Sequence, residues 1–213
     1  MTDLGFIHRY EPASVAQAPP VLLLHGTGGD ESDLIDLGHV VAPGSALLSP
    51  RGNVLERGMP RFFRRLAEGV FDEADIRLRA GQLADFVAAA RKRYGLAAPV
   101  ALGFSNGANI AAALLLEHPQ VLAGAVLLRA MTPLAVPAER PIDGVPVLIV
   151  SGAQDPLAPV ANPARLAAQL RDRGGIVDHR IVPAGHGLIQ ADVDIATAWL
   201  DGNARTAARQ ATA

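Results

Sequence analysis

Short apolar runs recur along the chain, and segments with the spacing of amphipathic helices lie between them. Runs of this kind, bounded by Gly or Pro, are typical of parallel strands that are covered on both faces of a sheet. They predict strands over 21–24, 100–104, 125–128 and 147–150. Weaker runs predict further strands near 6–10, 46–48 and 178–182, which makes about seven in all.

The intervening segments predict helices that span Glu31 or Ser32 to Val41, 73–94, 106–118, 162–174 and 189–200. Gly95 is expected to end the second helix in a left-handed conformation, and Asn162 is expected to cap the fourth. Strands that alternate with helices predict an α/β fold, with a mainly parallel sheet and helices on both of its faces. We expect one domain over residues 1–213, with a frayed tail from about residue 203.

Two connecting segments lack this periodicity. Residues 49–73 are rich in Gly and Arg and predict a long loop with one helical turn. Residues 129–144 are interrupted by Pro133, Pro137 and Pro141 and are too short for an added lid domain. We therefore expect a cleft that is covered only by loops.

The composition argues against several classes of function. Half of the 213 residues are hydrophobic, yet no apolar run approaches the roughly 18–20 residues that cross a bilayer, so no membrane insertion is expected. A net charge of −2 offers no broad attraction to nucleic acid. The absence of cysteine excludes a thiol nucleophile. No secretory signal is visible at the N-terminus, so a cytoplasmic location is the expectation.

The strand over 100–104 breaks at Gly103-Phe104-Ser105-Asn106-Gly107 and continues as an apolar helix. A Gly-x-Ser-x-Gly sequence between a strand and a helix is typical of a nucleophile elbow, a sharp turn that exposes the serine at the end of its strand. The glycines allow the strand and the helix to approach closely. Ser105 is therefore the candidate nucleophile.

Asp155 and His186 also follow predicted strands directly, and the carboxyl ends of parallel strands meet at one edge of a sheet. A serine hydroxyl needs an imidazole to take its proton, and the imidazole needs a carboxylate to orient it. Ser105, Asp155 and His186 thus form a candidate triad, in the chain order of α/β-hydrolases. An oxyanion hole is expected from the backbone N–H groups of Asn106 and Thr27.

Other carboxylates and histidines compete for these roles. Asp143 precedes a predicted strand and Asp178 begins one, so both are expected at the opposite edge, while Asp192 is expected on the last helix. His25 precedes the glycine-rich turn and is expected to brace it. The remaining histidines are expected at the surface or in packing roles, and they are His8, His39, His118 and His179.

Five segments together resemble the phospholipase/carboxylesterase family of the α/β-hydrolase superfamily, whose members are small esterases and acyl-thioesterases. They are Leu24-His25-Gly26-Thr27-Gly28-Gly29-Asp30, Ser49-Pro50-Arg51-Gly52, Gly103-Phe104-Ser105-Asn106-Gly107, Gly152-Ala153-Gln154-Asp155 and Gly185-His186. The resemblance implies that Arg51 fixes a loop. Many members of the family have Gln after the serine, and Asn106 instead resembles a branch associated with hydroquinone and aromatic-compound exposure.

The leading hypothesis is a serine carboxylesterase that acts on small soluble or aryl esters through an acyl-enzyme. An acyl-thioesterase or a lysophospholipase is the alternative, and a non-catalytic small-molecule binding protein is a third. Candidate pocket residues, any of which could instead belong to the core, are Phe62, Phe63, Met131, Leu134, Leu157 and Leu188. No nucleotide-binding or metal-binding motif is present, so neither a cofactor nor a metal is expected. A homodimer remains open.

Overall fold

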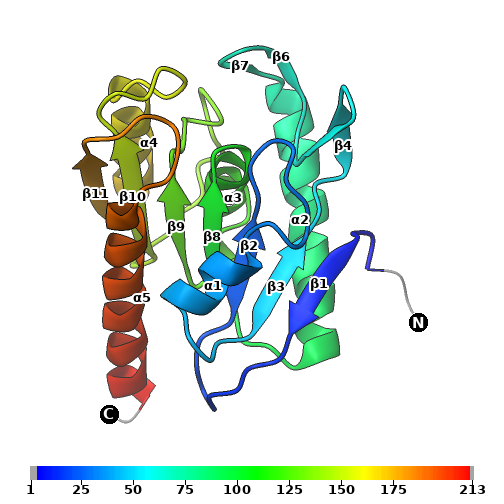
Figure 1. Cartoon of the computed structure of the whole chain (residues 1–213), viewed down its shortest axis with the longest axis vertical. Coiled ribbons are helices and arrows are strands. Elements are labelled where there is room, and N and C mark those ends of the chain that lie inside the picture. The colour runs from blue at the N-terminus through cyan, green and yellow to red at the C-terminus, as the bar shows by residue number, and fades with distance from the viewer. Residues whose placement is uncertain (1–3, 212–213) are drawn as a thin grey trace.

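A seven-stranded sheet forms the centre of the computed structural model (Figure 1), which describes the backbone of residues 4–211 and the side chains of residues 4–203. In spatial order the strands are β1 (His8–Glu11), β3 (Leu47–Pro50), β2 (Val21–Leu24), β8 (Val100–Phe104), β9 (Gly124–Leu128), β10 (Pro146–Gly152) and β11 (Ile176–Val182). The edge strand β1 runs antiparallel to β3, and the others are parallel. The predicted mainly parallel sheet is confirmed.

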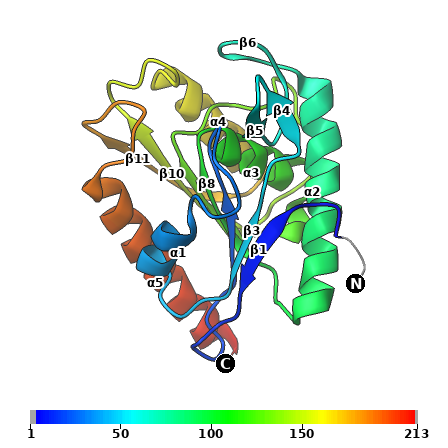
Figure 2. The same ribbon diagram turned by 45° about the vertical axis from the view of Figure 1, so that its right-hand side comes forward.

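Helices cover both faces of the sheet (Figures 1 and 2). One face carries α1 (Ile35–Val41) and α5 (Gln190–Ala211), and the other carries α2 (Glu73–Tyr94), α3 (Asn106–Glu117) and α4 (Ala161–Arg171), with the short 3-10 helix η1 (Pro119–Val121) after α3. Within the described part of the chain, none of the helices combines the length and the hydropathy that a membrane span requires.

The continuous apolar runs follow from this layering. In β2, Leu22 and Leu24 lie in the core beneath α2, α3 and α4, whereas Val21 and Leu23 lie in the core beneath α1 and α5. Successive side chains of a strand point to opposite faces, so a strand between two helical layers must be apolar at every position.

Helix α2 has the predicted bounds and the predicted end. Its first turn is capped by Asp72, whose carboxylate accepts a hydrogen bond from the Asp75 N–H at 3.1 Å. Gly95 ends it with a φ of 69°, and its N–H donates to the Arg91 carbonyl. A side chain would be strained in that conformation, which explains the glycine.

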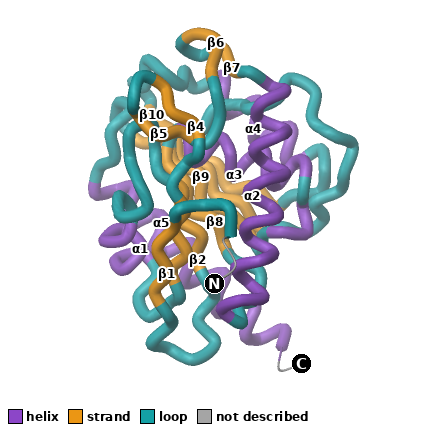
Figure 3. Tube along the Cα trace, turned by 90° about the vertical axis from the view of Figure 1, so that its right-hand side faces the viewer, coloured by secondary structure: helices purple, strands orange, loops and turns teal. Residues whose placement is uncertain are grey.

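The prediction for residues 49–73 is wrong, because this segment forms two β-hairpins. They pair β4 (Val54–Glu56) with β5 (Met59–Arg61) and β6 (Arg65–Ala67) with β7 (Val70–Phe71), and they lie together at one end of the molecule (Figure 3). Arg57 and Gly58 both have positive φ, 53° and 82°, as a tight hairpin turn requires. Strands of two or three residues are too short to show alternation.

Several predicted boundaries also move. Helix α1 begins at Ile35 and not at Glu31 or Ser32, and α4 ends at Arg171 and not at 174. Helix α4 begins at Ala161, and Asn162 lies inside it, where its side-chain oxygen accepts a hydrogen bond from the Thr132 N–H at 2.6 Å. The last helix begins after Ile189, at Gln190. Its backbone is helical to Ala211, and residues 212–213 and the side chains from residue 204 on lie outside the described part of the chain. The frayed tail from about residue 203 stays a prediction.

The elbow between β8 and α3 is packed backbone against backbone. A Cβ built on Gly107 would lie 1.9 Å from the Leu24 carbonyl oxygen, and one built on Gly103 would lie 2.6 Å from the Gly107 carbonyl oxygen. Neither contact can relax by moving a side chain. Both glycines are therefore sterically required at these positions.

We expect Gly107→Ala to lower the free energy of unfolding by at least about 3 kcal/mol or to prevent folding, because the methyl group overlaps rigid backbone. The matched control is Gly81→Ala in the interior of α2, where the new methyl would lie 3.8 Å from its nearest neighbour. That change should be neutral or stabilise by about 0.5–1 kcal/mol. Urea unfolding measures both, and equal effects would contradict the steric argument.

Candidate active site

Ser105, His186 and Asp155 lie in one hydrogen-bonded row at the carboxyl edge of the sheet. The Ser105 Oγ is 2.9 Å from His186 Nε2, and His186 Nδ1 is 2.8 Å from Asp155 Oδ2. Ser105 follows β8, Asp155 follows β10, and His186 lies in the segment after β11. Residues that are 31 and 81 positions apart in sequence thus meet at the predicted place.

Each member of this row is held by its surroundings. Ser105 has a φ of 52°, and its N–H donates to the Leu128 carbonyl at 2.9 Å. The Asp155 side chain is fully buried, and its Oδ1 accepts hydrogen bonds from the N–H groups of Leu157 and Ala158 at 2.9 and 3.1 Å. The Asp155 Oδ2 is thereby aimed at His186. A left-handed serine that persists in this setting is typical of a functional turn.

Thr27 and Asn106, whose backbone N–H groups are the candidate oxyanion donors, both line the same cavity. Neither N–H donates to any other residue that the structure describes. The side chains hold the two turns: the Thr27 hydroxyl oxygen accepts a hydrogen bond from Arg61 at 2.9 Å, and the Asn106 amide oxygen accepts one from the Phe62 N–H at 2.7 Å. Both N–H groups therefore stay candidates for the oxyanion hole.

His25 is buried behind the glycine-rich turn. Its Nδ1 donates to the Gly26 carbonyl at 2.6 Å, and its Nε2 accepts from the Gly52 N–H at 3.0 Å. This pattern requires a neutral ring, and burial lowers the pKa of His25 in the same sense. His25 therefore joins the turn after β2 to the segment after β3, which is the bracing role expected from the sequence.

Arg51 fixes the next part of the same loop. Its guanidinium donates to both carboxylate oxygens of Glu31, at 2.5 and 2.8 Å, and this contact holds the pKa of Glu31 below its usual range. A bidentate pair of this kind gives orientation as well as energy. Arg51 thus holds Glu31 and fixes this loop, as the family resemblance implies.

A cavity of about 310 Å³ opens beside the Ser105 hydroxyl. Among the six expected pocket residues, Met131 and Leu157 line it. Phe62, Phe63 and Leu134 do not, because their side chains are 3%, 0% and 1% exposed and belong to the core. Leu188 packs against the core beneath α1 and α5. These four expectations are corrected.

Much of the cavity wall comes from the two hairpins, which the sequence did not predict. Arg61 on β5 and Arg65, Glu68, Gly69 and Phe71 on the β6–β7 hairpin line it. The remaining lining residues are Phe104, Asn109 and Arg129, together with Thr27, Asn106, Ser105 and His186. A loop predicted over 49–73 does not indicate which of its side chains face the cavity.

The competing carboxylates lie elsewhere. Asp143 lines a different hollow, and Asp178 pairs with Arg180 on β11. Asp192 is fully buried in the first turn of α5, where it pairs with Arg129. None of the three contacts His186, whereas Asp155 does.

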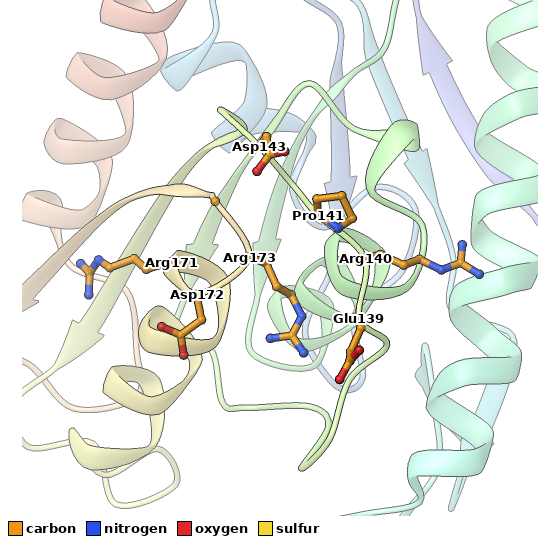
Figure 4. Close-up of a pocket in the computed structure, with 8 residues that line it drawn as sticks. Glu139, Arg140, Pro141, Asp143, Arg171, Asp172 and Arg173 are labelled. Atoms are coloured by element: carbon orange, nitrogen blue, oxygen red, sulfur yellow. The ribbon is translucent and has the colours of Figure 1, made fainter.

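A larger hollow, of about 650 Å³, is lined by none of the three residues of this row. Figure 4 shows the residues that line it. It is bordered by residues 139–143 before β10 and by residues 171–174 before β11, which places it at the amino ends of these strands. Arg140 and Arg171 point outward on opposite sides of it. Within the described residues, no group of three or more His, Cys, Asp or Glu side chains is placed to hold a metal ion.

Comparison with known proteins gives the family. A family model for the alpha/beta hydrolase fold matches residues 57–143. The chain is 44% identical over 181 residues to MhqD of Bacillus subtilis (strain 168). MhqD is named as a hydrolase, and the match covers 84% of this chain and 90% of MhqD.

Solved structures of carboxylesterases superpose over nearly the whole chain. The Bacillus cereus carboxylesterase shares 41% sequence identity with a TM-score of 0.90, and the match covers 92% of this chain and 94% of that one. A carboxylesterase from Mesorhizobium loti shares 34% identity with a TM-score of 0.89, over 95% and 97% of the two chains. The chain therefore belongs to the α/β-hydrolase fold family and is a carboxylic-ester hydrolase of its carboxylesterase group.

Proposed function

We propose that the protein is a serine carboxylesterase that hydrolyses small soluble or aryl carboxylic esters through an acyl-enzyme intermediate. The observation that carries the proposal is the row of hydrogen bonds from Asp155 through His186 to Ser105 at the wall of a cavity. A nucleophile, a base within hydrogen-bond reach and a carboxylate that orients the base are the parts that covalent acyl transfer needs.

In the first half of the reaction, the Ser105 Oγ attacks the ester carbonyl carbon while His186 Nε2 takes the hydroxyl proton. The N–H groups of Thr27 and Asn106 stabilise the oxyanion, and the latter lies at the N-terminus of α3, where the helix dipole adds to its effect. When the tetrahedral intermediate collapses, the carbon–oxygen bond to the alcohol breaks and His186 returns the proton to the departing oxygen.

In the second half, water attacks the acyl-enzyme and gives one proton to His186 Nε2. When this tetrahedral intermediate collapses, the bond to the Ser105 Oγ breaks, His186 returns the proton to that oxygen, and the carboxylic acid is released. Asp155 keeps Nδ1 of His186 protonated and stabilises the ring when it is charged. The cavity supports small substrates, because about 310 Å³ is at the lower end of the range for ligand sites.

Ser105→Ala should abolish both ester hydrolysis and labelling by a fluorophosphonate, while circular dichroism and the melting temperature stay unchanged. The hydroxyl contacts His186 and is not part of the core, so its loss leaves the packing intact. Ester turnover near that of the wild type would remove Ser105 from the mechanism. A wild-type chain that is not labelled would favour the binding-protein hypothesis.

Asp155→Asn should lower kcat by about 10⁴-fold, because an amide allows the wrong tautomer of His186. The loss should not add to that of Ser105→Ala, since triad members act as a unit. Asp85→Asn, an exposed change on the outer side of α2, is the control for removing one negative charge. Comparable kinetics of the two variants would rule out Asp155 as the acid.

Catalytic efficiency should fall beyond medium acyl chains, and no jump should appear at a lipid interface. Each buried methylene gains about 0.8 kcal/mol only where an apolar slot can hold it, and a cavity of about 310 Å³ has room for only a short chain. A series of esters from acetate to palmitate, measured below and above the aggregation threshold, gives kcat/KM directly. A steady rise to palmitate or interfacial activation would support the lysophospholipase alternative, and preference for an acyl-CoA would support the thioesterase.

A further inference from the structure

A buried ion pair lies beside the active site and has no part in the chemistry proposed above. Arg129 is the first residue after β9, Asp192 lies in the first turn of α5, and they are 1% and 0% exposed. Two parallel hydrogen bonds join the guanidinium to the carboxylate, at 2.7 and 2.8 Å. Because taking both charges out of water offsets much of their attraction, stability alone is a weak reason for such a pair.

The guanidinium of Arg129 uses all five of its N–H donors, and two of them hold the backbone on either side of His186. Nε donates to the Gly185 carbonyl at 2.9 Å, and one terminal nitrogen donates to the Gly187 carbonyl at 3.1 Å. The other terminal nitrogen donates to the carbonyl of Val150, two residues before the end of β10, at 3.3 Å. Arg129 therefore links the histidine segment to the fixed edge of the sheet.

Asp192 holds the same segment from its other end. Its Oδ2 accepts a hydrogen bond from the Ile189 N–H at 2.8 Å, and its own N–H donates to the Ile189 carbonyl at 3.0 Å. The ion pair thus contacts residues 185, 187 and 189, with His186 between the first two.

Within this segment Leu188 packs against the core beneath α1 and α5, whereas the two glycines that flank His186 have no side chain to pack. A Cβ built on Gly187 would meet nothing within 4 Å, and one built on Gly185 would meet only the Gln154 carbonyl oxygen, at 3.8 Å. Glycine has more accessible backbone conformations than any other residue, so the chain on either side of His186 needs restraint from outside. The Gly185 carbonyl packs against Gly152, and the hydrogen bonds from Arg129 to the Gly185 and Gly187 carbonyls supply a second restraint.

The backbone of Arg129 is itself in an uncommon conformation. Its φ is 56°, in the left-handed region that a residue with a side chain seldom adopts, and its N–H donates to the Val150 carbonyl at 2.9 Å. Ser105 has the same kind of φ at the end of the neighbouring strand β8. The turn at Arg129 directs its side chain beneath the histidine segment.

We propose that the Arg129–Asp192 pair positions His186 by fixing the backbone of residues 185–189. The pair acts through the imidazole and touches no reacting atom, so both are positioning residues. This inference rests on the proposed role of His186 as the base, which must stay within hydrogen-bond reach of both Ser105 and Asp155. A displacement of about 1 Å is enough to cost about 100-fold in rate.

A double variant separates positioning from simple stabilisation. Arg129→Met combined with Asp192→Leu replaces the pair by apolar side chains, an exchange that often leaves stability unchanged, whereas Asp192→Asn leaves the arginine charge without its partner. Arg129→Lys keeps the charge but loses the fork that reaches two carbonyls and the carboxylate together. Leu170→Ala, a fully buried change on α4, is the control for loss of stability alone.

We expect the double variant and Arg129→Lys to melt no lower than Leu170→Ala, while kcat falls about 100-fold and KM changes less than about threefold. Leu170→Ala should lower the melting temperature and leave kcat unchanged. The proposal would be overturned if the double variant regained both the stability and the kcat that Asp192→Asn loses. A loss of kcat in the double variant no larger than that in Leu170→Ala would also overturn it.

Amide hydrogen exchange distinguishes this inference from the function on which it rests. Exchange over residues 185–189 should become faster in the double variant but not in Leu170→Ala. If the wild-type chain hydrolyses no ester, the proposed function fails, and the exchange result still decides whether the pair holds the segment. Unchanged exchange there would refute positioning even if activity were lost.

Discussion

The close contact between the start of α3 and the end of β2 fixes the geometry of the catalytic edge. Gly107 lies so near the Leu24 carbonyl that no side chain fits, and this contact brings the turn after β2 against the elbow that carries Ser105. The nucleophile and both proposed oxyanion donors therefore belong to one junction of packed backbone. Their relative positions depend on steric contact between rigid elements, which is less easily displaced than hydrogen bonds between flexible side chains.

The remaining parts of the site lie on loops, and long polar side chains hold them. His25 joins the turn after β2 to the segment after β3, Arg61 holds the Thr27 hydroxyl, and Arg129 holds the carbonyls around His186. Loops cannot bury enough apolar surface to fix themselves, and their backbone groups still need partners. A buried arginine meets both needs, because one planar group can satisfy several carbonyls at once.

Predictions from the sequence were accurate where the chain has a strong local pattern. The runs of β2, β8, β9 and β10 must be apolar on both faces, which makes these strands easy to predict. Gly103 and Gly107 are sterically required, and this requirement produces a motif that can be recognised in the sequence. The hairpins over 54–71 were missed, because strands of two or three residues carry no period. Phe62 and Phe63 were misplaced for a related reason: an aromatic residue in such a segment has the same appearance whether it enters the core or a cavity.

The sequence predicted Asp155 as the acid of the triad, but it did not predict that Asp192 pairs with Arg129. Both carboxylates are buried near the histidine segment, yet their hydrogen-bond partners differ, and so does their ability to stabilise a protonated imidazole. The Asp155 oxygens are shared between backbone N–H groups and His186, so its charge remains available to a protonated imidazole. The charge of Asp192 is already matched by Arg129, and it can add little to a second cation. An arginine directly after a buried strand, at the position that Ser105 takes after β8, was the available signal for this second role.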